Sequence, residues 1–207
     1  MKLCFVTVGA TASFEKLVQA VLQESFLAEL EKYNFTHLLV QYGKGGQHIF
    51  EKYATERVKS SDRAHGLDIG GFDLRPSLTE YLRMVQEDSS KHQELGMVIS
   101  HAGKAPVQFW ITKSMESNRF SGTGSILAAL RASVPLVVVP NPDLADNHQQ
   151  ELADELACQG YAVIGNVADL PSTVGKAANR RERAPFFLNA SKNSLDVPLS
   201  DELSFVD

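Results

Sequence analysis

Short apolar runs alternate with longer stretches of helical periodicity along the first 165 residues. A run such as residues 2–8 (KLCFVTV) has the length and continuous hydrophobicity of a strand that is buried on both faces. Between such runs, apolar residues recur every three to four positions, as at Phe14, Leu17, Val18 and Val21, which predicts amphipathic helices. Strands that alternate with helices predict a parallel sheet with helices on both faces.

The predicted elements follow this alternation. We expect helices over residues 14–32, 49–58, 78–86, 123–130 and 147–159, and Gly160 ends the last of them as a typical C-terminal glycine. We expect strands over residues 2–8, 37–42, 67–72, 97–100, 136–139 and 161–165. The fold class is therefore α/β, a Rossmann-like doubly wound parallel sheet.

The chain divides into a folded domain and a tail. We predict one domain over residues 1–170 and a C-terminal helix and tail over residues 171–207, and we interpret the tail either as docking a partner or as disordered. Four basic residues gather where this tail begins: Lys176, Arg180, Arg181 and Arg183. The net charge of −5 and a pI of about 5.7 argue against nucleic acid as a partner.

The sequence also indicates a protein that is cytosolic or is held at a membrane by something else. No apolar run approaches the ~20 residues that a membrane-spanning helix needs, and the first residues lead directly into a strand without a signal peptide. We expect both cysteines, Cys4 and Cys158, to be small buried hydrophobes of a reducing compartment.

Glycine-rich turns follow several predicted strands. Gly9 follows the first strand and Gly43 the second, while Gly103 and Gly124 flank the start of the helix at Ser125. Ligands of open α/β sheets bind at the carboxyl ends of the strands. Glycines let a phosphate approach the main chain, and the first N–H groups of a helix attract it. The sequence therefore predicts a phosphate-bearing ligand at this edge.

Three motifs carry a family resemblance: His101-Ala102-Gly103, Thr123-Gly124-Ser125 and Asn147-His148-Gln149. Together they resemble the sugar-nucleotide half of GT-B glycosyltransferases. Residues 5–9 and 41–45 are similar to the small subunit of the two-subunit UDP-GlcNAc transferase of dolichol-linked oligosaccharide synthesis. The resemblance covers about residues 2–165 and implies a single GT-B half-domain.

The resemblance implies an inverting transfer of GlcNAc from UDP-GlcNAc to GlcNAc-diphospho-dolichol. The chain would be the donor-binding subunit, active only with a membrane-anchored subunit that binds the lipid-linked acceptor. It would work at the cytosolic face of the endoplasmic reticulum for N-glycosylation. No metal or other cofactor is implied, because helix N-termini and backbone N–H groups can stabilise the UDP leaving group.

The resemblance also implies substrate-binding residues. It assigns no general base and no other catalytic residue. The candidates for contact with UDP-GlcNAc are Gly9, Thr11, Gly43, His101, Ala102, Gly103, Thr123, Gly124, Ser125, Asn147, His148 and Gln149.

The sequence departs from the family pattern in two places. Ala128 stands where relatives commonly carry an acidic residue for the ribose hydroxyls, which predicts either weaker ribose binding or a ribose contact from another group. An insertion, residues 104–122, separates His101-Ala102-Gly103 from Thr123-Gly124-Ser125. We interpret it as a lid, a surface loop or a retained intron, since its ends can be encoded with splice-like GTAAG and CAG sequences. Spliced transcripts that all keep the segment would exclude the intron.

Two other functions compete with the transferase. Gly122-Thr123-Gly124 with Ala128 mimics a dinucleotide-binding fingerprint, and Asp143 lies about 20 residues further on, as in NAD-dependent oxidoreductases. A non-catalytic nucleotide-sugar-binding or scaffolding subunit would explain the insertion and the missing acidic residue.

Overall fold

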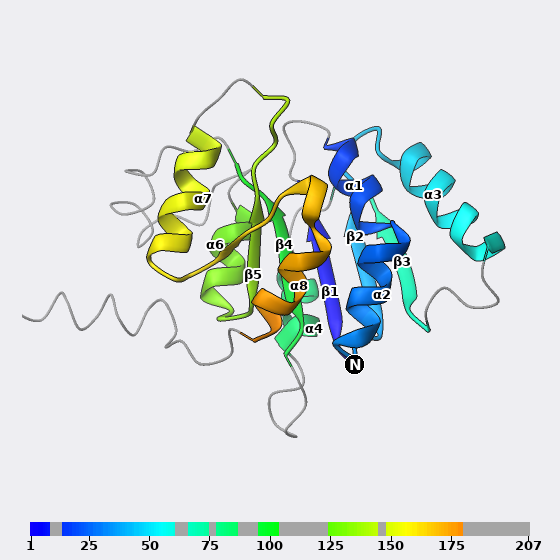
Figure 1. The fold of residues 1–207 in the computed structure, drawn as a ribbon, viewed down its shortest axis with the longest axis horizontal. Helices are drawn as coiled ribbons and strands as arrows, with labels where there is room; N and C mark the ends of the chain where they lie inside the picture. Colours follow the sequence, from blue (N-terminus) through cyan, green and yellow to red (C-terminus); the bar gives the residue numbers. More distant parts are fainter. Residues whose placement is uncertain are drawn as a thin grey trace, which may run out of the picture.

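A computed structural model describes residues 1–8, 14–60, 66–74, 78–86, 95–103, 124–144 and 148–179. Its centre is a six-stranded sheet in the order β3-β2-β1-β4-β5-β6, in which every neighbouring pair is parallel (Figure 1). The order reverses between β1 and β4, as in doubly wound sheets. The strands are β1 (Leu3–Thr7), β2 (His37–Gln41), β3 (Asp68–Phe72), β4 (Met97–His101), β5 (Leu136–Val139) and β6 (Val163–Ile164).

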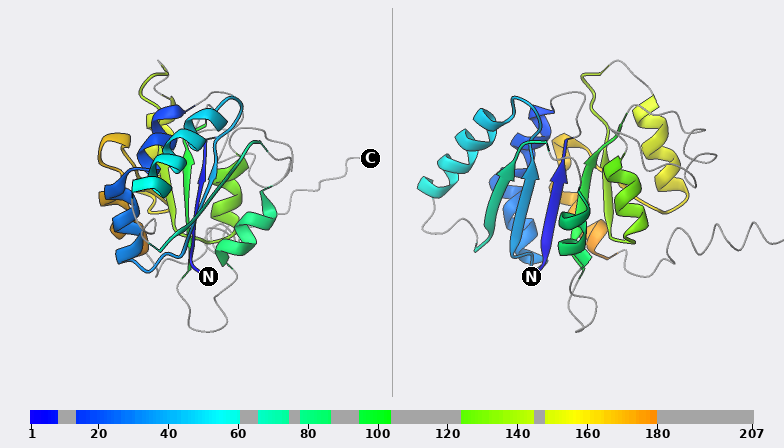
Figure 2. Two further views of the ribbon diagram at one scale, coloured as in Figure 1. Left: turned by 90° about the vertical axis from the view of Figure 1, so that its right-hand side faces the viewer. Right: turned by 180° about the vertical axis from the view of Figure 1, so that it is seen from behind.

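Two layers of helices cover the sheet, as the edge-on view of Figure 2 shows. The first core cluster holds side chains from α1, α2, α3 and α8, and the second holds side chains from α4, α6 and α7. Continuous apolar strands suit this double cover, and β1, β4 and β5 are buried throughout. The helices are α1 (Glu15–Val21), α2 (Glu24–Lys32), α3 (Gln47–Ser60), α4 (Thr79–Gln86), α6 (Gly124–Arg131), α7 (His148–Cys158) and α8 (Pro171–Ala178).

The strand and helix predictions are confirmed except at two places. The predicted helix over residues 14–32 is wrong, because Leu22 and Gln23 separate α1 from α2. Gln23 has extended backbone angles (φ −73°, ψ 147°), so the second helix starts in a new direction and buries Phe26, Leu27 and Leu30. The strand predicted over residues 161–165 shrinks to the two residues of β6.

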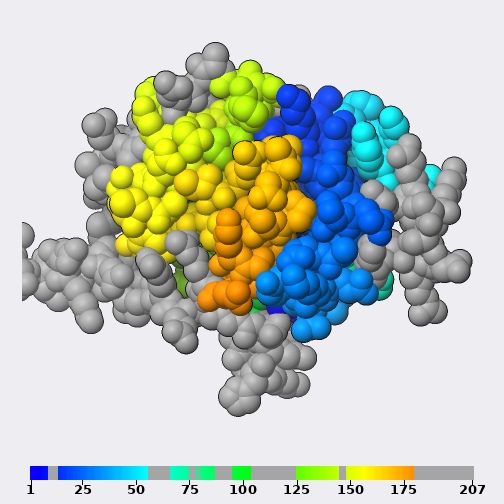
Figure 3. Space-filling view, viewed as in Figure 1, coloured from blue at the N-terminus to red at the C-terminus, as the bar shows by residue number. Residues whose placement is uncertain are grey.

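The C-terminal helix is part of the core. Thr173, Val174, Gly175 and Ala177 of α8 are buried, and Pro171 opens the helix. Figure 3 shows α8, in orange, packed beside the blue side chains of the N-terminal helices, and α8 contacts α2. A short 3₁₀ helix, η2 (Val167–Asp169), precedes it. The rest of the predicted tail, residues 180–207, lies outside the described residues.

The two cysteines differ, so the expectation that both are buried is wrong for Cys158. Cys4 is fully buried in β1, and this burial raises the pKa of its thiol. Cys158 is exposed at the end of α7. The buried face of α7 is formed by Gln149, Leu152, Ala153 and Leu156. Cys158, the last residue of the helix, lies off that face.

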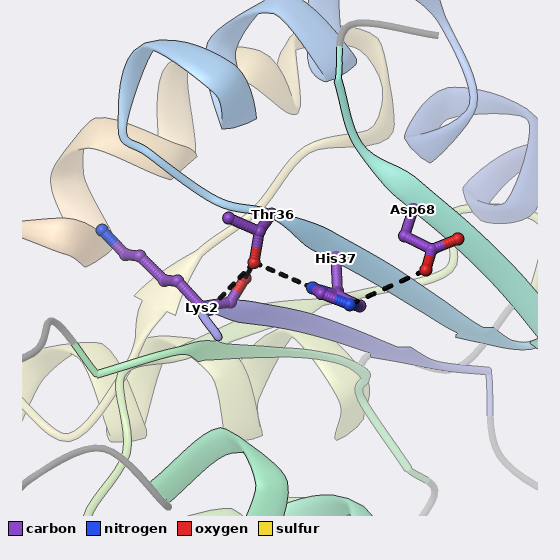
Figure 4. Close-up of polar contacts among 4 residues, drawn as sticks. All are labelled: Lys2, Thr36, His37 and Asp68. Carbon is purple, nitrogen blue, oxygen red and sulfur yellow. Dashed lines mark hydrogen bonds and ion pairs between the residues drawn. The ribbon is translucent and has the colours of Figure 1, made fainter. Parts of the chain in front are cut away.

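A polar cluster ties the amino ends of three strands together (Figure 4). The Lys2 backbone N–H donates to Thr36 Oγ1 at 3.0 Å, and Thr36 Oγ1 lies 2.8 Å from His37 Nδ1. His37 Nε2 lies 3.7 Å from a carboxylate oxygen of Asp68 on β3. These contacts hold β1, β2 and β3 in register at the edge opposite the glycine turns.

The described helices contain no segment that is both long and apolar enough to cross a membrane.

Candidate functional site

Buried polar side chains gather at the carboxyl edge of the sheet. The described part of the chain has nine buried polar or charged residues, and seven of them lie where strands end or the next helix begins. Burying polar groups is unfavourable unless they are paired, so such a concentration marks a site. The seven are Thr7, Gln41, Ser100, His101, Ser125, Asn141 and Gln149.

The first pair joins the ends of β1 and β2. The Thr7 hydroxyl donates to Gln41 Oε1 at 2.5 Å, and the Val8 backbone N–H donates to the Gln41 carbonyl at 3.3 Å. The chain then turns through Gly43 and Gly45, which have positive φ values of 70° and 76°. This turn lies at the carboxyl edge, as the sequence predicts for Gly43.

The second pair joins β4 to the start of α6. Ser100 Oγ lies 2.9 Å from Ser125 Oγ and 3.1 Å from the carbonyl oxygen of His101. Either serine hydroxyl can be the donor between the two. Besides this side-chain contact, the backbone N–H of Ser125 in the first turn of α6 is a group that can meet an anion.

The insertion does not detach α6 from β4. Ser100 and Ser125 are 25 positions apart in sequence, yet their hydroxyls touch. Helix α6 begins at Gly124, so its N-terminus lies at the carboxyl edge beside Ala102 and Gly103, which follow β4 and are buried. A helix N-terminus there provides free N–H groups and a positive dipole end.

Helix α6 lacks the acidic residue common in the family. Its first turn contains no carboxylate, and Ala128 is partly buried against the second core cluster. No described residue of this helix therefore replaces the missing acid.

The third group joins β4, the loop after β5 and the start of α7. Gln149 Oε1 accepts the Asn141 backbone N–H at 2.9 Å and lies 3.0 Å from His101 Nε2. Asn141 also orders its own loop, because its Oδ1 accepts the Asp143 backbone N–H at 3.1 Å. The Phe14 and His101 rings pack in a T-shaped arrangement with their centroids 5.2 Å apart.

One half of the Gln149 carboxamide has no partner. Gln149 is 1% exposed, and its Nε2 is buried without a hydrogen-bond partner among the described atoms. A buried donor left unpaired costs about 1–3 kcal/mol. A ligand with an acceptor oxygen at this point would remove that cost.

Two exposed polar contacts also lie near this edge. Lys16 Nζ lies 2.6 Å from Asp143 Oδ1, and this ion pair links α1 to the loop after β5. His148 Nδ1 lies 3.2 Å from Glu151 Oε2 within α7. No group of three His, Cys, Asp or Glu side chains able to hold a metal ion occurs within the described ranges.

These features define a doubly wound α/β domain with a candidate ligand site at the carboxyl edge of its sheet. The family model described as "Glycosyltransferase family 28 C-terminal domain" matches residues 3–107 and 120–195. The chain therefore belongs to the glycosyltransferase family 28 C-terminal domain family. The match skips residues 108–119, so the family pattern breaks inside the predicted insertion.

Individual relatives support the same family assignment. The chain is similar to the UDP-N-acetylglucosamine transferase subunit ALG13 of Saccharomyces cerevisiae, with 35% identity over 172 residues, 77% of this chain and 75% of that protein. The protein of the same name in Eremothecium gossypii is 33% identical over 194 residues, 89% of this chain and 85% of that protein. An NMR solution structure of ALG13 matches with a TM-score of 0.59 and 29% identity, covering 94% of each chain.

These comparisons confirm the family and the fold class predicted from the motifs. They leave the oxidoreductase interpretation without support, and Asp143, its proposed ribose ligand, pairs with Lys16 instead. The structure brings His101 and Gln149 together, places Ser125 at the same edge, and leaves His148 exposed beside Glu151. Four predicted site residues lie outside the described residues: Gly9, Thr11, Thr123 and Asn147.

Sequence reasoning did not assign a role to several residues of this edge. Asn141 follows an apolar strand inside Pro140-Asn141-Pro142, a signal that could have marked it as a loop-ordering residue. Phe14 was predicted only as a helix residue, yet its ring contacts His101. Thr7 and Gln41 were noted only as parts of motifs, and each ends its strand.

Proposed function

We propose that this chain is the donor-binding subunit of a heteromeric UDP-GlcNAc transferase. It binds UDP-GlcNAc at the carboxyl edge of the sheet and passes GlcNAc to GlcNAc-diphospho-dolichol. The observation that carries the proposal is the buried polar edge, with the unpartnered Gln149 amide at the start of α7, in a chain of this family. The relatives named above are transferase subunits that use UDP-N-acetylglucosamine by name.

The diphosphate is the ligand part that suits the start of α6. The backbone N–H groups of Gly124 and Ser125 belong to the first turn of this helix and have no partner within it. Two phosphate charges gain from that dipole end. Gly103 and, outside the described residues, Gly9, Thr11 and Thr123 complete the proposed diphosphate cradle.

The sugar is the ligand part that suits the start of α7. Gln149 offers a buried N–H donor, and hydroxyl and carbonyl oxygens of GlcNAc are acceptors. We assign His148, Asn147, Ala102 and Gly43 to the wall around the sugar and the acceptor side, without a direct bond for any of them.

The reaction is a displacement at the anomeric carbon of GlcNAc. The acceptor hydroxyl oxygen forms the new bond to that carbon, the bond from carbon to the diphosphate oxygen breaks, and the configuration inverts. UDP leaves with its charge stabilised by the α6 N-terminus, and this stabilisation is how the chain lowers the activation barrier. The acceptor proton passes to a base that we assign to no residue of this chain.

The acceptor requires a second chain. We propose a membrane-anchored partner that binds the lipid-linked acceptor and holds this chain at the cytosolic face of the endoplasmic reticulum. The word "subunit" in the relatives' names supports a partner. The isolated chain is then expected to transfer almost no sugar.

The test is transfer of labelled GlcNAc from UDP-GlcNAc to a GlcNAc-diphospho-lipid by the full chain with its membrane partner. Gln149→Glu keeps the oxygen that Asn141 needs but replaces the unpartnered NH₂ by an acceptor beside a dianionic ligand. We expect about a 10- to 100-fold loss of kcat/KM, as for a lost hydrogen bond to a charged or strongly polar group.

The matched control is Gln150→Glu, which makes the same change at the next residue, where the side chain is exposed and donates to Asp154. It should keep wild-type transfer. Wild-type binding of UDP-GlcNAc without transfer would favour the non-catalytic subunit, which the insertion and Ala128 support. A chain that neither binds UDP-GlcNAc nor transfers GlcNAc would reject the proposed function.

A further inference from the structure

We infer that His101 is a positioning residue, which holds the Gln149 carboxamide in the orientation that donates to the sugar nucleotide and does not itself contact the ligand. This inference rests on the proposed function, because it concerns the same site.

The orientation of the Gln149 amide follows from its partners. The Asn141 backbone N–H can only donate, so the Gln149 atom that it meets at 2.9 Å is the carbonyl oxygen. The same oxygen lies 3.0 Å from His101 Nε2, which must therefore carry a hydrogen. With the oxygen held by two donors, the NH₂ group is the buried half of the amide that has no partner among the described atoms.

The His101 side chain is already engaged within the protein, through Nε2 with Gln149 and through its ring with Phe14. His101 is 4% exposed, and it ends β4 with its backbone paired to Val139 of β5. The Phe14 ring from the start of α1 packs against the imidazole in a T-shaped arrangement, with 67° between the ring planes. Strand pairing and ring contact together fix where Nε2 lies.

Without the His101 side chain, the Gln149 carboxamide is no longer held in one orientation. One donor, the Asn141 N–H, still meets the Gln149 oxygen, but the amide can then swing about its last torsion. Broad terminal torsions of this kind need two contacts to be held. The ligand would have to restore the orientation on binding, which weakens its affinity.

Two substitutions separate the hydrogen bond from the ring. His101→Phe keeps the ring and its contact with Phe14 but removes the donor. His101→Gln places an amide N–H near the position of Nε2. In the transfer assay with the membrane partner, we expect His101→Phe to raise KM for UDP-GlcNAc about threefold to tenfold with little change of kcat. His101→Gln should recover most of that loss.

A double-mutant cycle distinguishes positioning from direct contact. In a Gln149→Leu background, or in Gln149→Met if the first variant unfolds, His101→Phe should have no further effect on KM. An equal effect in both backgrounds would overturn the inference, and so would failure of His101→Gln to restore KM. If the wild type shows no transfer, the proposed function fails and this inference falls with it. Additive effects in an active enzyme would remove this inference alone.

Discussion

Deleting residues 104–122 should stabilise the fold and keep α6 in place. The deletion shortens the connection between Gly103 and Gly124 from twenty residues to the single Thr123. Closing a loop costs about 0.6 kcal/mol for each doubling of its length, and this change spans a little over four doublings. The expected gain in the free energy of unfolding is therefore at most about 2–3 kcal/mol.

The shortened connection is long enough to join β4 to α6. The hydroxyls of Ser100 and Ser125 are 2.9 Å apart. Two serine side chains add about 5 Å, so their Cα atoms lie within about 8 Å of each other. After the deletion, six residue steps connect these two Cα atoms, and an extended chain of six steps spans about 20 Å. No strain is needed to join β4 to α6 through a short turn.

Thermal unfolding followed by circular dichroism measures the effect. For a chain of this size, about 1 kcal/mol corresponds to about 2–4 °C, so we expect Tm to rise by about 5–10 °C. The control replaces residues 104–122 by a Gly/Ser linker of equal length, which should melt like the wild type. A deletion variant that melts no higher than the wild type would refute the closure argument. A linker variant that melts several degrees lower would show that the segment stabilises the domain.

The same variants test the diphosphate turn. A continuous Gly103-Thr123-Gly124-Ser125 turn should bind UDP-GlcNAc more tightly than the interrupted one, because small misplacements of a positioning group are costly. Isothermal titration of both proteins gives the comparison. Equal affinities would mean that the contact between Ser100 and Ser125 is sufficient to hold the turn in its binding geometry.

Three further predictions concern stability and reactivity. Lys16→Met removes an exposed ion pair and should lower the free energy of unfolding by less than about 1 kcal/mol, a difference that high salt abolishes in urea titrations. One thiol, Cys158, should react with a maleimide in the native protein, and Cys4 only after unfolding, as mass spectrometry would record. Gly71→Ala puts a Cβ 2.6 Å from the Phe50 ring and should destabilise by about 1–3 kcal/mol, measured as a lower urea midpoint.

The sheet was predictable because its signal is local. Strands buried on both faces read as continuous apolar runs, and β1, β4 and β5 all show this pattern. The break between α1 and α2 was not predictable, because the local pattern of apolar residues continues across it. Leu22, Phe26, Leu27 and Leu30 continue the helical spacing across Gln23, and no glycine or proline interrupts it. Only packing against the sheet decides that the chain turns there.

The site was predictable by residue type but not by partner. Parallel strands bring their carboxyl ends to one edge, so the motifs after β4 and before α7 were expected to meet. Their spacing contains no indication that His101 pairs with Gln149, 48 positions away, or that Ser125 is committed to Ser100. Such pairs depend on side-chain directions that only the packed structure fixes.

The internal pairing of this edge explains how the domain tolerates an insertion at its diphosphate turn. The carboxyl edge is held by side-chain contacts between neighbouring elements: Thr7 with Gln41, Ser100 with Ser125, and His101 with Gln149. Each contact joins groups that are buried, so breaking one leaves unpaired polar atoms and is costly. The position of α6 is therefore set by its contact with β4 and by the apolar face it buries, through Ile126, and does not depend on the length of the connection. These three contacts are made within the protein itself, so they set the geometry of this edge in the free chain.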